Sequence, residues 1–537
     1  MADDYDKAKV PELLLREGGL TEGAARIVAR ETGVPEADVY GVGSFFHLLS
    51  SPDTKVRICQ GLPCRLRGSE ALLEHAKAVG LPVEPCSCLA ACDRPVAVLR
   101  ERTTLPEVTP ADIDATQGDW STLKAAAIDD EDAWFGTIYP RESQPDLCAI
   151  DLAGAQDYSG EAMNLALEAG SEEVIQSILD SGLQGRGGAG FPAGIKWRAV
   201  HGEANPTRYM VLNADEGEPA TFKDREVMMR RPDLVIEGLA IAARMIGAKT
   251  IYLYLRGEFQ GPWKALERAI DEFANRGVTE GLDFHLHAGH GAYICGEETA
   301  LLEALEGKRG MPRLKPPYPT QHGLWGKPTL VHNVETIACV PAIMKRGPQW
   351  FSDLGRTGAG SKLYCISGHV ARPGTYELPL GVSLDELVEA AGGYVGTLKA
   401  FSPGGASSGF LPATERQRAL DFKALSEVGS MLGSAGVVVL NDTIEMPGAV
   451  KAQLEFFTAE SCGQCAPCRI GTRFQERALD RLMAAVQDAS DAVNEITQQI
   501  EDVAWEMDEG SICGLGQIAA LPLTSAMRWF PKEFAHE

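Results

Sequence analysis

The sequence predicts a chain of several domains, α/β and α+β in class, and three observations support this. Its 537 residues exceed what one hydrophobic core supports, so we expect three or four domains. Between residues 151 and 360, helix-like segments alternate with strand-like runs such as Thr250–Leu255, which is typical of an α/β domain. Residues 361–450 hold several strand-like runs and one helix, whereas residues 451–537 show helical periodicity throughout.

These patterns divide the chain into segments. We expect a helical unit at 1–50, a small strand–helix–strand layer at 51–105, a linker at 106–150, an α/β domain at 151–360, a β-rich domain at 361–450 and a helical domain at 451–537. The linker is predicted from a stretch rich in Thr, Asp and Pro that offers little core of its own.

Composition narrows the classes of function. Lys and Arg total 50 against 75 Asp and Glu, which gives a formal net charge of −25. Such a chain is a poor match for nucleic acid or an anionic membrane surface, so we expect neither as a partner. No run approaches the roughly 20 apolar residues that span a bilayer, and the first residues lack a basic and an apolar signal region. We therefore expect a cytoplasmic protein without membrane insertion.

Two cysteine pairs lie in the 51–105 layer, Cys59-x4-Cys64 and Cys88-x3-Cys92, where strands give way to loops. The chain has thirteen cysteines, an odd number that favours metal ligands over disulfides. The four thiols can hold a [2Fe–2S] cluster, since thiolates are the usual cluster ligands. The alternative is a set of structural thiols.

A glycine-rich loop follows residue 182, and Gly185, Gly187 and Gly190 fit the dinucleotide pattern G-x-G-x-x-G. That pattern should follow a buried strand, but residues 171–180 have helical spacing, so the context excludes a Rossmann unit. Glycines let backbone amides approach phosphate oxygens, Lys196 adds a positive charge and Phe191 a flat face. The loop suits a phosphate-bearing aromatic cofactor; the alternative is a flexible surface loop.

Polar residues follow the strand-like run 208–212. Asn213, Asp215, Glu216 and Glu218 lie at the strand's end, where α/β domains gather ligands, and they can receive ribityl or ribose hydroxyls. The alternative for any one of them is an acidic, solvated turn.

A second motif, Tyr293-Ile-Cys-Gly-Glu-Glu-Thr299, predicts a strand end followed by a helix start. Its two glutamates have an ordinary structural explanation at a helix N-terminus, and Cys295 is expected to be a core thiol. His285, His287 and His290 can be read as metal ligands, but their spacing fits a strand leading into a glycine loop better.

The strongest local signal is Cys462-Gly-Gln-Cys465-Ala-Pro-Cys468, a C-x2-C-x2-C run of the kind that holds a cubane cluster. Cys513 is the candidate fourth ligand, because a helical hairpin between the two segments can return the chain to the cluster. Zinc is the competing metal, although its sites usually show two separated C-x2-C pairs.

Five motifs together resemble one family. The loop 185–197, the runs 213–219 and 293–299, and the cysteine segments 461–468 and 511–513 look like the 51-kDa FMN-binding NADH dehydrogenase subunit of respiratory complex I. The first hundred residues resemble the 24-kDa thioredoxin-like [2Fe–2S] subunit, fused in front. The resemblance implies an FMN- and NAD-binding α/β domain, a β-grasp-like (SLBB) domain and a C-terminal helical bundle with a cluster.

The resemblance also implies site residues and cofactors. FMN would be held by Gly185, Gly187, Gly188, Lys196, Asn213, Asp215, Glu216, Glu297 and Asn333, and Gly296 would also belong to the cofactor site. NAD(H) would be held by Phe191, Glu218, Tyr293, Glu298 and Tyr318. The metal ligands would be Cys462, Cys465, Cys468 and Cys513 for [4Fe–4S], and Cys59, Cys64, Cys88 and Cys92 for [2Fe–2S]. Hydride would pass directly between NAD(H) and FMN, so no catalytic side chain is expected.

Three positions depart from the family pattern. His332 stands where an Asn is usual, Ala199 replaces a common adenine-stacking aromatic, and the gap between Cys64 and Cys88 is short.

Fusion of the two modules in one chain is typical of diaphorase (beta) subunits of cytoplasmic NAD-dependent, molybdenum-containing formate dehydrogenases. We expect such a role, with a molybdenum-containing alpha subunit and a small [2Fe–2S] gamma subunit as partners. The alternatives are the diaphorase subunit of an NAD-reducing hydrogenase, a complex I-like subunit, and a non-catalytic scaffold without flavin.

Overall fold

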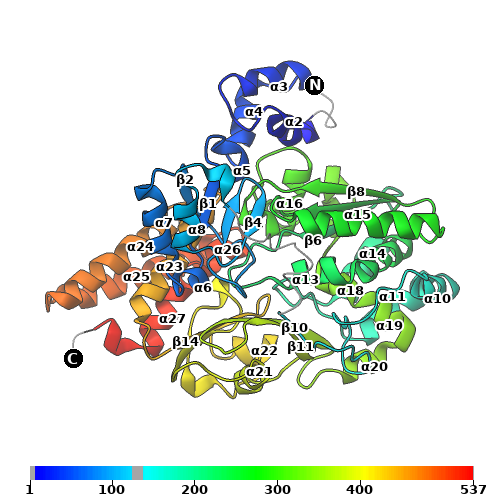
Figure 1. The fold of residues 1–537 in the computed structure, drawn as a ribbon. Coiled ribbons are helices and arrows are strands. Elements are labelled where there is room, and N and C mark those ends of the chain that lie inside the picture. Colours follow the sequence, from blue (N-terminus) through cyan, green and yellow to red (C-terminus); the bar gives the residue numbers. More distant parts are fainter. Residues whose placement is uncertain (1–6, 124–136, 536–537) are drawn as a thin grey trace.

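A computed structural model describes residues 7–123 and 137–535 (Figure 1). These residues form three sheets with helices packed around them, in the order α+β, α/β, β-rich and α-helical along the chain. The expected multidomain α/β and α+β class is confirmed. Among the described residues, no helix combines the length and apolar character needed to cross a bilayer.

The N-terminal part has a group of helices followed by a small sheet. The helices are α2 (Val10–Arg16), α3 (Ala24–Thr32), α4 (Glu36–Gly43) and α5 (His47–Ser50). The sheet has the order β2-β1-β3-β4, from β1 (Val56–Cys59), β2 (Val83–Cys86), β3 (Val98–Arg100) and β4 (Thr103–Leu105). Strand β2 is parallel to β1, while β3 is antiparallel to both β1 and β4. Helices α6 (Leu62–Arg65) and α7 (Ser69–Ala78) connect β1 to β2.

The described parts of the expected linker, residues 106–150, have structure of their own. Helix α8 (Pro110–Ala115) starts with a capping box at Thr109 and packs on α7, so Ile113 and Leu123 join the core of the first sheet. Strand β5 (Ile138–Tyr139) pairs with a strand of the β-rich domain, far along the chain. The expectation of a linker with little core of its own is wrong, because Ile113, Leu123 and β5 are buried only by contacts with segments distant in the sequence.

The α/β domain is built on a four-stranded parallel sheet with the order β8-β7-β6-β9. Its strands are β6 (Tyr209–Ala214), β7 (Thr250–Leu255), β8 (Asp283–Ala288) and β9 (Thr329–Asn333). The longer helices are α10 (Glu161–Ala169), α11 (Ser171–Asp180), α12 (Ala193–His201), α13 (Lys223–Arg230), α14 (Pro232–Ile246), α15 (Gln260–Asn275) and α16 (Glu298–Leu305). The shorter ones are α17 (Pro319–His322), α18 (Val334–Ala338), α19 (Val340–Arg346) and α20 (Pro348–Asp353).

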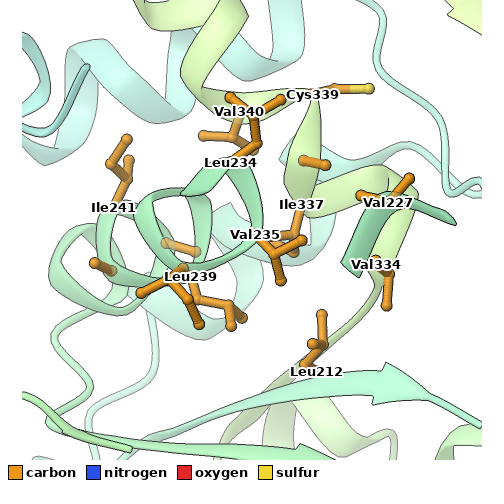
Figure 2. Close-up of a cluster of buried hydrophobic side chains, with 14 of the residues drawn as sticks. Leu212, Val227, Leu234, Val235, Leu239, Ile241, Val334, Ile337, Cys339 and Val340 are labelled. Atoms are coloured by element: carbon orange, nitrogen blue, oxygen red, sulfur yellow. The ribbon is translucent and has the colours of Figure 1, made fainter. Parts of the chain in front are cut away.

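Helix α14 lies at the centre of this domain and is buried on nearly every side. Figure 2 shows its Leu234, Val235 and Leu239 among side chains of β6, α13, α18 and α19. Gly238 allows the close approach, because a Cβ there would clash with the carbonyl oxygen of Ile337. A helix that is buried on nearly every side belongs in a core, and α14 forms much of the core of this domain.

The β-rich domain and the C-terminal helices complete the chain. The sheet order is β13-β12-β14-β10-β11-β5, with β10 (Ser361–Gly368), β11 (Gly374–Pro379), β12 (Leu398–Ser402), β13 (Leu411–Pro412) and β14 (Gly436–Asn441). It holds two helices where we expected one, α21 (Leu384–Ala390) and α22 (Phe422–Ser426). The C-terminal helices are α23 (Met446–Glu460), α24 (Ala466–Gln487), α25 (Ala492–Gly510), α26 (Gly514–Ile518) and α27 (Leu521–Trp529).

The tight packing of α14 on α18 predicts that Gly238→Ala destabilises the protein. The added methyl group meets backbone rather than a flexible side chain, so we expect a loss of about 1–3 kcal/mol in the free energy of unfolding, measured by urea denaturation. Gly448→Ala in α23 is the matched control, because a Cβ there meets nothing within 4 Å. It should be neutral or stabilising by up to about 1 kcal/mol. Equal stability of the two variants would contradict the packing argument.

Helix α14 also predicts a pH dependence. Burial raises the pKa of Glu237, which accepts a hydrogen bond from the Met163 amide at 3.0 Å, to about 7. Between the ordinary pKa of a glutamate and about pH 7, Glu237 is protonated in the folded protein but ionised in the unfolded chain. The free energy of unfolding therefore falls as the pH rises through this range. Glu237→Gln keeps the acceptor without the charge. It should stabilise by about 2 kcal/mol at about pH 8 and by much less at about pH 5.

The control for this experiment is Glu267→Gln, since Glu267 is exposed on α15. It should change the urea midpoint little at either pH. A Glu237→Gln variant with the same pH dependence as the parent protein would contradict the assignment.

Candidate functional site

The candidate site lies at the carboxyl edge of the parallel sheet. Strand β6 has β7 on one side and β9 on the other, so the chain changes direction across the sheet between β6 and β9. Asn213 and Asn333 are opposite each other in the register of these two strands, at their carboxyl ends. Open α/β sheets bind ligands at such a switch point.

The glycine loop is closed by backbone contacts between α11 and α12. The Gly185 amide donates to the Phe191 carbonyl at 2.9 Å, and the Ala193 amide donates to the Leu183 carbonyl at 2.9 Å. A Cβ at Gly187 would lie 3.0 Å from the Cβ of Asn333, so only glycine lets the loop lie directly on the end of β9. These contacts hold the loop against the end of β9, which disfavours the alternative of a flexible surface loop.

The carboxylates of the acidic turn after β6, residues 215–218, have different hydrogen-bond partners. Glu216 accepts hydrogen bonds from the Asp224 and Arg225 amides at 2.7 and 3.0 Å, which supports the start of α13. Burial raises the pKa of Glu216 to about 8. Glu218 accepts from the Tyr293 hydroxyl at 2.5 Å and from the Ser407 amide at 2.9 Å, which joins the α/β domain to the β-rich one.

Asp215 differs from its neighbours, because its Oδ2 atom is buried without a hydrogen-bond partner among the described residues. Burial raises the pKa of Asp215 well above its ordinary value. A buried polar atom without a partner is costly, so this oxygen fits a ligand that brings a hydroxyl donor.

A pair of lysines and a pair of glutamates form the opposite wall. The Lys196 ammonium lies 2.7 Å from Glu298, and the Lys315 ammonium lies 2.8 Å from Glu297 and 3.2 Å from Glu298. Burial opposes ionisation of Glu298, but the two lysines lower its pKa below the ordinary range. Glu297 also caps α16 by accepting from the Thr299 and Ala300 amides. The expected strand end before this helix is instead a short 3-10 turn, Tyr293–Gly296, because the strand has already ended at Ala288.

Two adjoining cavities collect every cofactor residue that the sequence predicts. The larger, of about 710 Å³, is lined by Gly185, Gly187, Gly188, Phe191, Lys196, Asn213, Gly296, Glu297, Glu298, Tyr318 and Asn333. The smaller, of about 480 Å³, adds Asp215, Glu216, Glu218 and Tyr293. Both volumes suit small-molecule ligands. Phe191 and Tyr318 are half-exposed at the larger cavity, so their flat faces remain available to a ring.

The larger cavity reaches the C-terminal cysteine cluster, because Cys513 also lines it. Cys465 is the N-cap of α24 and Cys513 the N-cap of α26, so two of the four thiols lie at helix N-termini. Burial raises the pKa of Cys468 to about 12 and that of Cys513 to about 11. Such thiols give up their protons when a metal binds, which fits cluster ligands.

The N-terminal quartet, Cys59, Cys64, Cys88 and Cys92, is fully buried. The Cys88 and Cys92 sulfurs are 3.3 Å apart. Hydrogen bonds with Cys64 and Cys88 raise the pKa of Cys59, while hydrogen bonds with Cys59 and Cys92 lower that of Cys88. All thirteen cysteines are free thiols. The short spacing between Cys64 and Cys88 therefore still brings the four sulfurs into one group.

Two arginines that sequence reasoning missed join this quartet to the acidic turn. Arg256 donates to the Glu216 carbonyl at 2.7 Å and to the Cys88 carbonyl at 2.8 Å. Arg225 donates to the Ala90 carbonyl and approaches Asp93 at 3.3 Å. Arg256 directly follows β7. The expectation that strand ends gather functional residues, which selected Asn213, could therefore also have selected Arg256. Lys315, in the Lys-Pro-Pro-Tyr run, was another missed residue.

The histidines of the 285–290 run pack as rings. His285 stacks on Tyr252 with centroids 5.0 Å apart, and His287 stacks on Tyr254 at 5.4 Å. Within residues 7–123 and 137–535, no three His, Cys, Asp or Glu side chains converge on a single metal ion, which concerns the histidines; an iron–sulfur cluster contains several irons and spreads its four thiolates over them. Cys295 is fully buried in the core, as expected.

Four protein-family models match the chain, in the same order as the domains of the structure. The model for the thioredoxin-like [2Fe–2S] ferredoxin matches residues 12–119, the Nuo51 FMN-binding domain 178–342 and the SLBB domain 363–411. The iron–sulfur binding region of NADH-ubiquinone oxidoreductase-F matches residues 448–537. The chain thus has an FMN-binding domain and domains of the [2Fe–2S] and [4Fe–4S] types.

Similar proteins cover most of the chain. The F 2 subunit of NADH-quinone oxidoreductase from Rhizobium meliloti (strain 1021) is 47% identical over 68% of this chain and 88% of its own length. The corresponding F protein of Rickettsia bellii (strain OSU 85-389) is 41% identical over 75% of this chain and 98% of its own. A solved NAD+-reducing [NiFe]-hydrogenase in the H2-reduced state aligns with a TM-score of 0.87, 32% identity, and coverage of 98% of this chain and 92% of that one.

Proposed function

The chain belongs to the family of NADH-quinone oxidoreductase F proteins, and on that premise we propose that it is the diaphorase subunit of an NAD-dependent formate dehydrogenase. It would pass electrons between NAD(H) and an iron–sulfur chain in a multisubunit complex. One observation carries the diaphorase role: a single cavity is lined by the glycine loop on one side and by Cys513 on another.

Bound FMN supplies the exchange between a two-electron hydride and single electrons. The protein's part is to hold and orient it. We assign Gly185, Gly187 and Gly188 to phosphate recognition through backbone amides, with Lys196 as the charge. Asp215, with its unpartnered oxygen, would accept a ribityl hydroxyl. The strand-end asparagines, opposite each other on β6 and β9, would contact the flavin at this edge of the sheet.

The remaining cavity residues would position NAD(H). Phe191 and Tyr318 present faces that suit the adenine. Glu298 would accept ribose hydroxyls and repel a 2′-phosphate, so the protein should prefer NADH to NADPH. Its lowered pKa supports this role, because the carboxylate stays charged at neutral pH. No side chain is needed to move a proton in the hydride step.

The four C-terminal cysteines would carry a [4Fe–4S] cluster, and the N-terminal quartet a [2Fe–2S] cluster. Arg256 joins the N-terminal quartet to the acidic turn, and Cys513 lines the larger cavity, so both positions support electron exchange with the same flavin. Clusters of this kind need reduced thiols, which favours a cytoplasmic location.

Fusion of the ferredoxin and flavin modules, with a short N-terminal module, supports molybdenum-containing alpha and small [2Fe–2S] gamma subunits of a formate dehydrogenase. A second candidate is an NAD-reducing hydrogenase, favoured by the near full-length alignment with a solved enzyme of that class. Native purification followed by metal analysis separates them, because molybdenum would accompany the first and nickel the second.

The diaphorase role predicts a specific activity pattern. The isolated, iron-replete subunit should reduce ferricyanide with NADH, at least about tenfold faster than with NADPH, and show no activity with formate. Glu298→Gln should narrow the preference for NADH, because it removes the charge that opposes a 2′-phosphate. The readouts are the initial rates and flavin absorption. Flavin-free, iron-loaded protein that is inert toward NADH would favour the scaffold alternative and contradict the proposal.

A further inference from the structure

Helix α24 carries four arginines on its exposed face, Arg469, Arg473, Arg477 and Arg481. They are four residues apart, so they follow one side of the helix over about 18 Å. We call these four residues the arginine stripe. Figure 1 shows α24 and α25 extending outward from the rest of the molecule, so the stripe lies on a projecting part of the structure.

The four arginines form no ion pair within the described part of the chain, although Glu476 and Asp480 lie on the same helix. Asp480 pairs with Lys451 at 2.7 Å. Arg481 donates to Gln499 of α25 at 3.4 Å, whereas Arg473 and Arg477 make no hydrogen bond or ion pair among the described residues. Helix α25 instead carries exposed carboxylates, at Glu495, Glu501, Asp502, Glu506, Asp508 and Glu509.

The stripe begins at the cysteine turn. Arg469 donates to the Gly463 carbonyl at 2.6 Å, and Gly463 lies between Cys462 and Cys465. Cys468 is in the first turn of the same helix. Ile470, which follows Arg469, is an apolar residue with a relative exposure of 64%, so an exposed apolar side chain lies beside the arginines. Protein interfaces commonly combine an exposed apolar residue with arginines in this way.

We propose that the arginine stripe and Ile470 form the docking surface for an acidic protein that exchanges single electrons with the C-terminal cluster. This inference rests on the proposed function, since it needs a cluster at Cys462, Cys465, Cys468 and Cys513. An acidic partner would be repelled by most of this surface and attracted by the stripe, so the charges orient it with its own redox centre toward the cysteine turn. Nucleic acid is disfavoured because the rest of the chain would repel it.

The test measures NAD+ reduction by an acidic one-electron carrier, reduced plant-type [2Fe–2S] ferredoxin. Two reduced ferredoxins, one NAD+ and one proton give two oxidised ferredoxins and NADH, which is followed by absorbance. The variant is Arg473→Glu/Arg477→Glu, which leaves Arg469 and its contact with the cysteine turn intact. Reduced methyl viologen, a small donor that needs no docking surface, reports the cofactor chemistry in the same direction.

The matched control is Arg26→Glu/Arg30→Glu, which reverses two exposed arginines at the same spacing on α3. We expect the KM for ferredoxin to rise at least tenfold in the α24 variant and less than twofold in the α3 control. Viologen rates should stay within twofold in both. The parent protein's ferredoxin rate should fall with added salt, and the α24 variant should lose that dependence. Arg473→Gln/Arg477→Gln should give an intermediate KM and guards against misfolding, with iron content measured for every variant.

Two results would overturn the docking surface while leaving the proposed function standing. One is an α24 variant with the parent's KM and salt dependence; the other is a parent protein active with viologen but inert with ferredoxin. Absence of NADH formation from viologen in the iron- and flavin-replete parent protein would instead overturn the proposed function itself.

Discussion

The proposed function depends on one cavity wall that the cofactor site shares with the C-terminal cysteine site. The segment that begins at Cys513 lines the same cavity as the glycine loop, although more than 300 residues separate them in the chain. A carrier of hydride and a carrier of single electrons can exchange electrons only if they lie close together. The fold achieves this by returning the chain through α24 and α25, so that α26 starts at the cavity rather than on the far side of the bundle.

Several buried polar contacts keep that wall in place. Glu218 links Tyr293 to Ser407, and the buried Glu335 accepts from Lys362 at 2.7 Å and pairs with Lys223 at 2.9 Å. These contacts join the β-rich domain to the segments that follow β6 and β9. Arg256 does the same for the N-terminal quartet. Breaking such a pair leaves an uncompensated buried charge, so each contact favours one arrangement of the domains.

Much of the site could be predicted from the sequence because its chemistry is local. The glycine loop, the turn after β6 and the C-x2-C-x2-C run each place their residues within a few positions, and strand ends in an α/β sheet meet at one edge. The residues that were missed act over long range. Arg256 reaches Cys88 across 168 positions, and β5 pairs with a strand that only the folded β-rich domain provides. No local pattern reports such contacts.

In the proposed function, electrons from NADH reach the C-terminal cluster only through the flavin held beside Cys513. Freeze-quench electron paramagnetic resonance of the full chain mixed with NADH, before and after removal of FMN, is the decisive experiment. We expect the reduced-cluster signal to form in the flavin-loaded protein, to be absent after flavin removal and to return when FMN is restored. A cluster that NADH reduces equally fast without flavin would contradict this expectation.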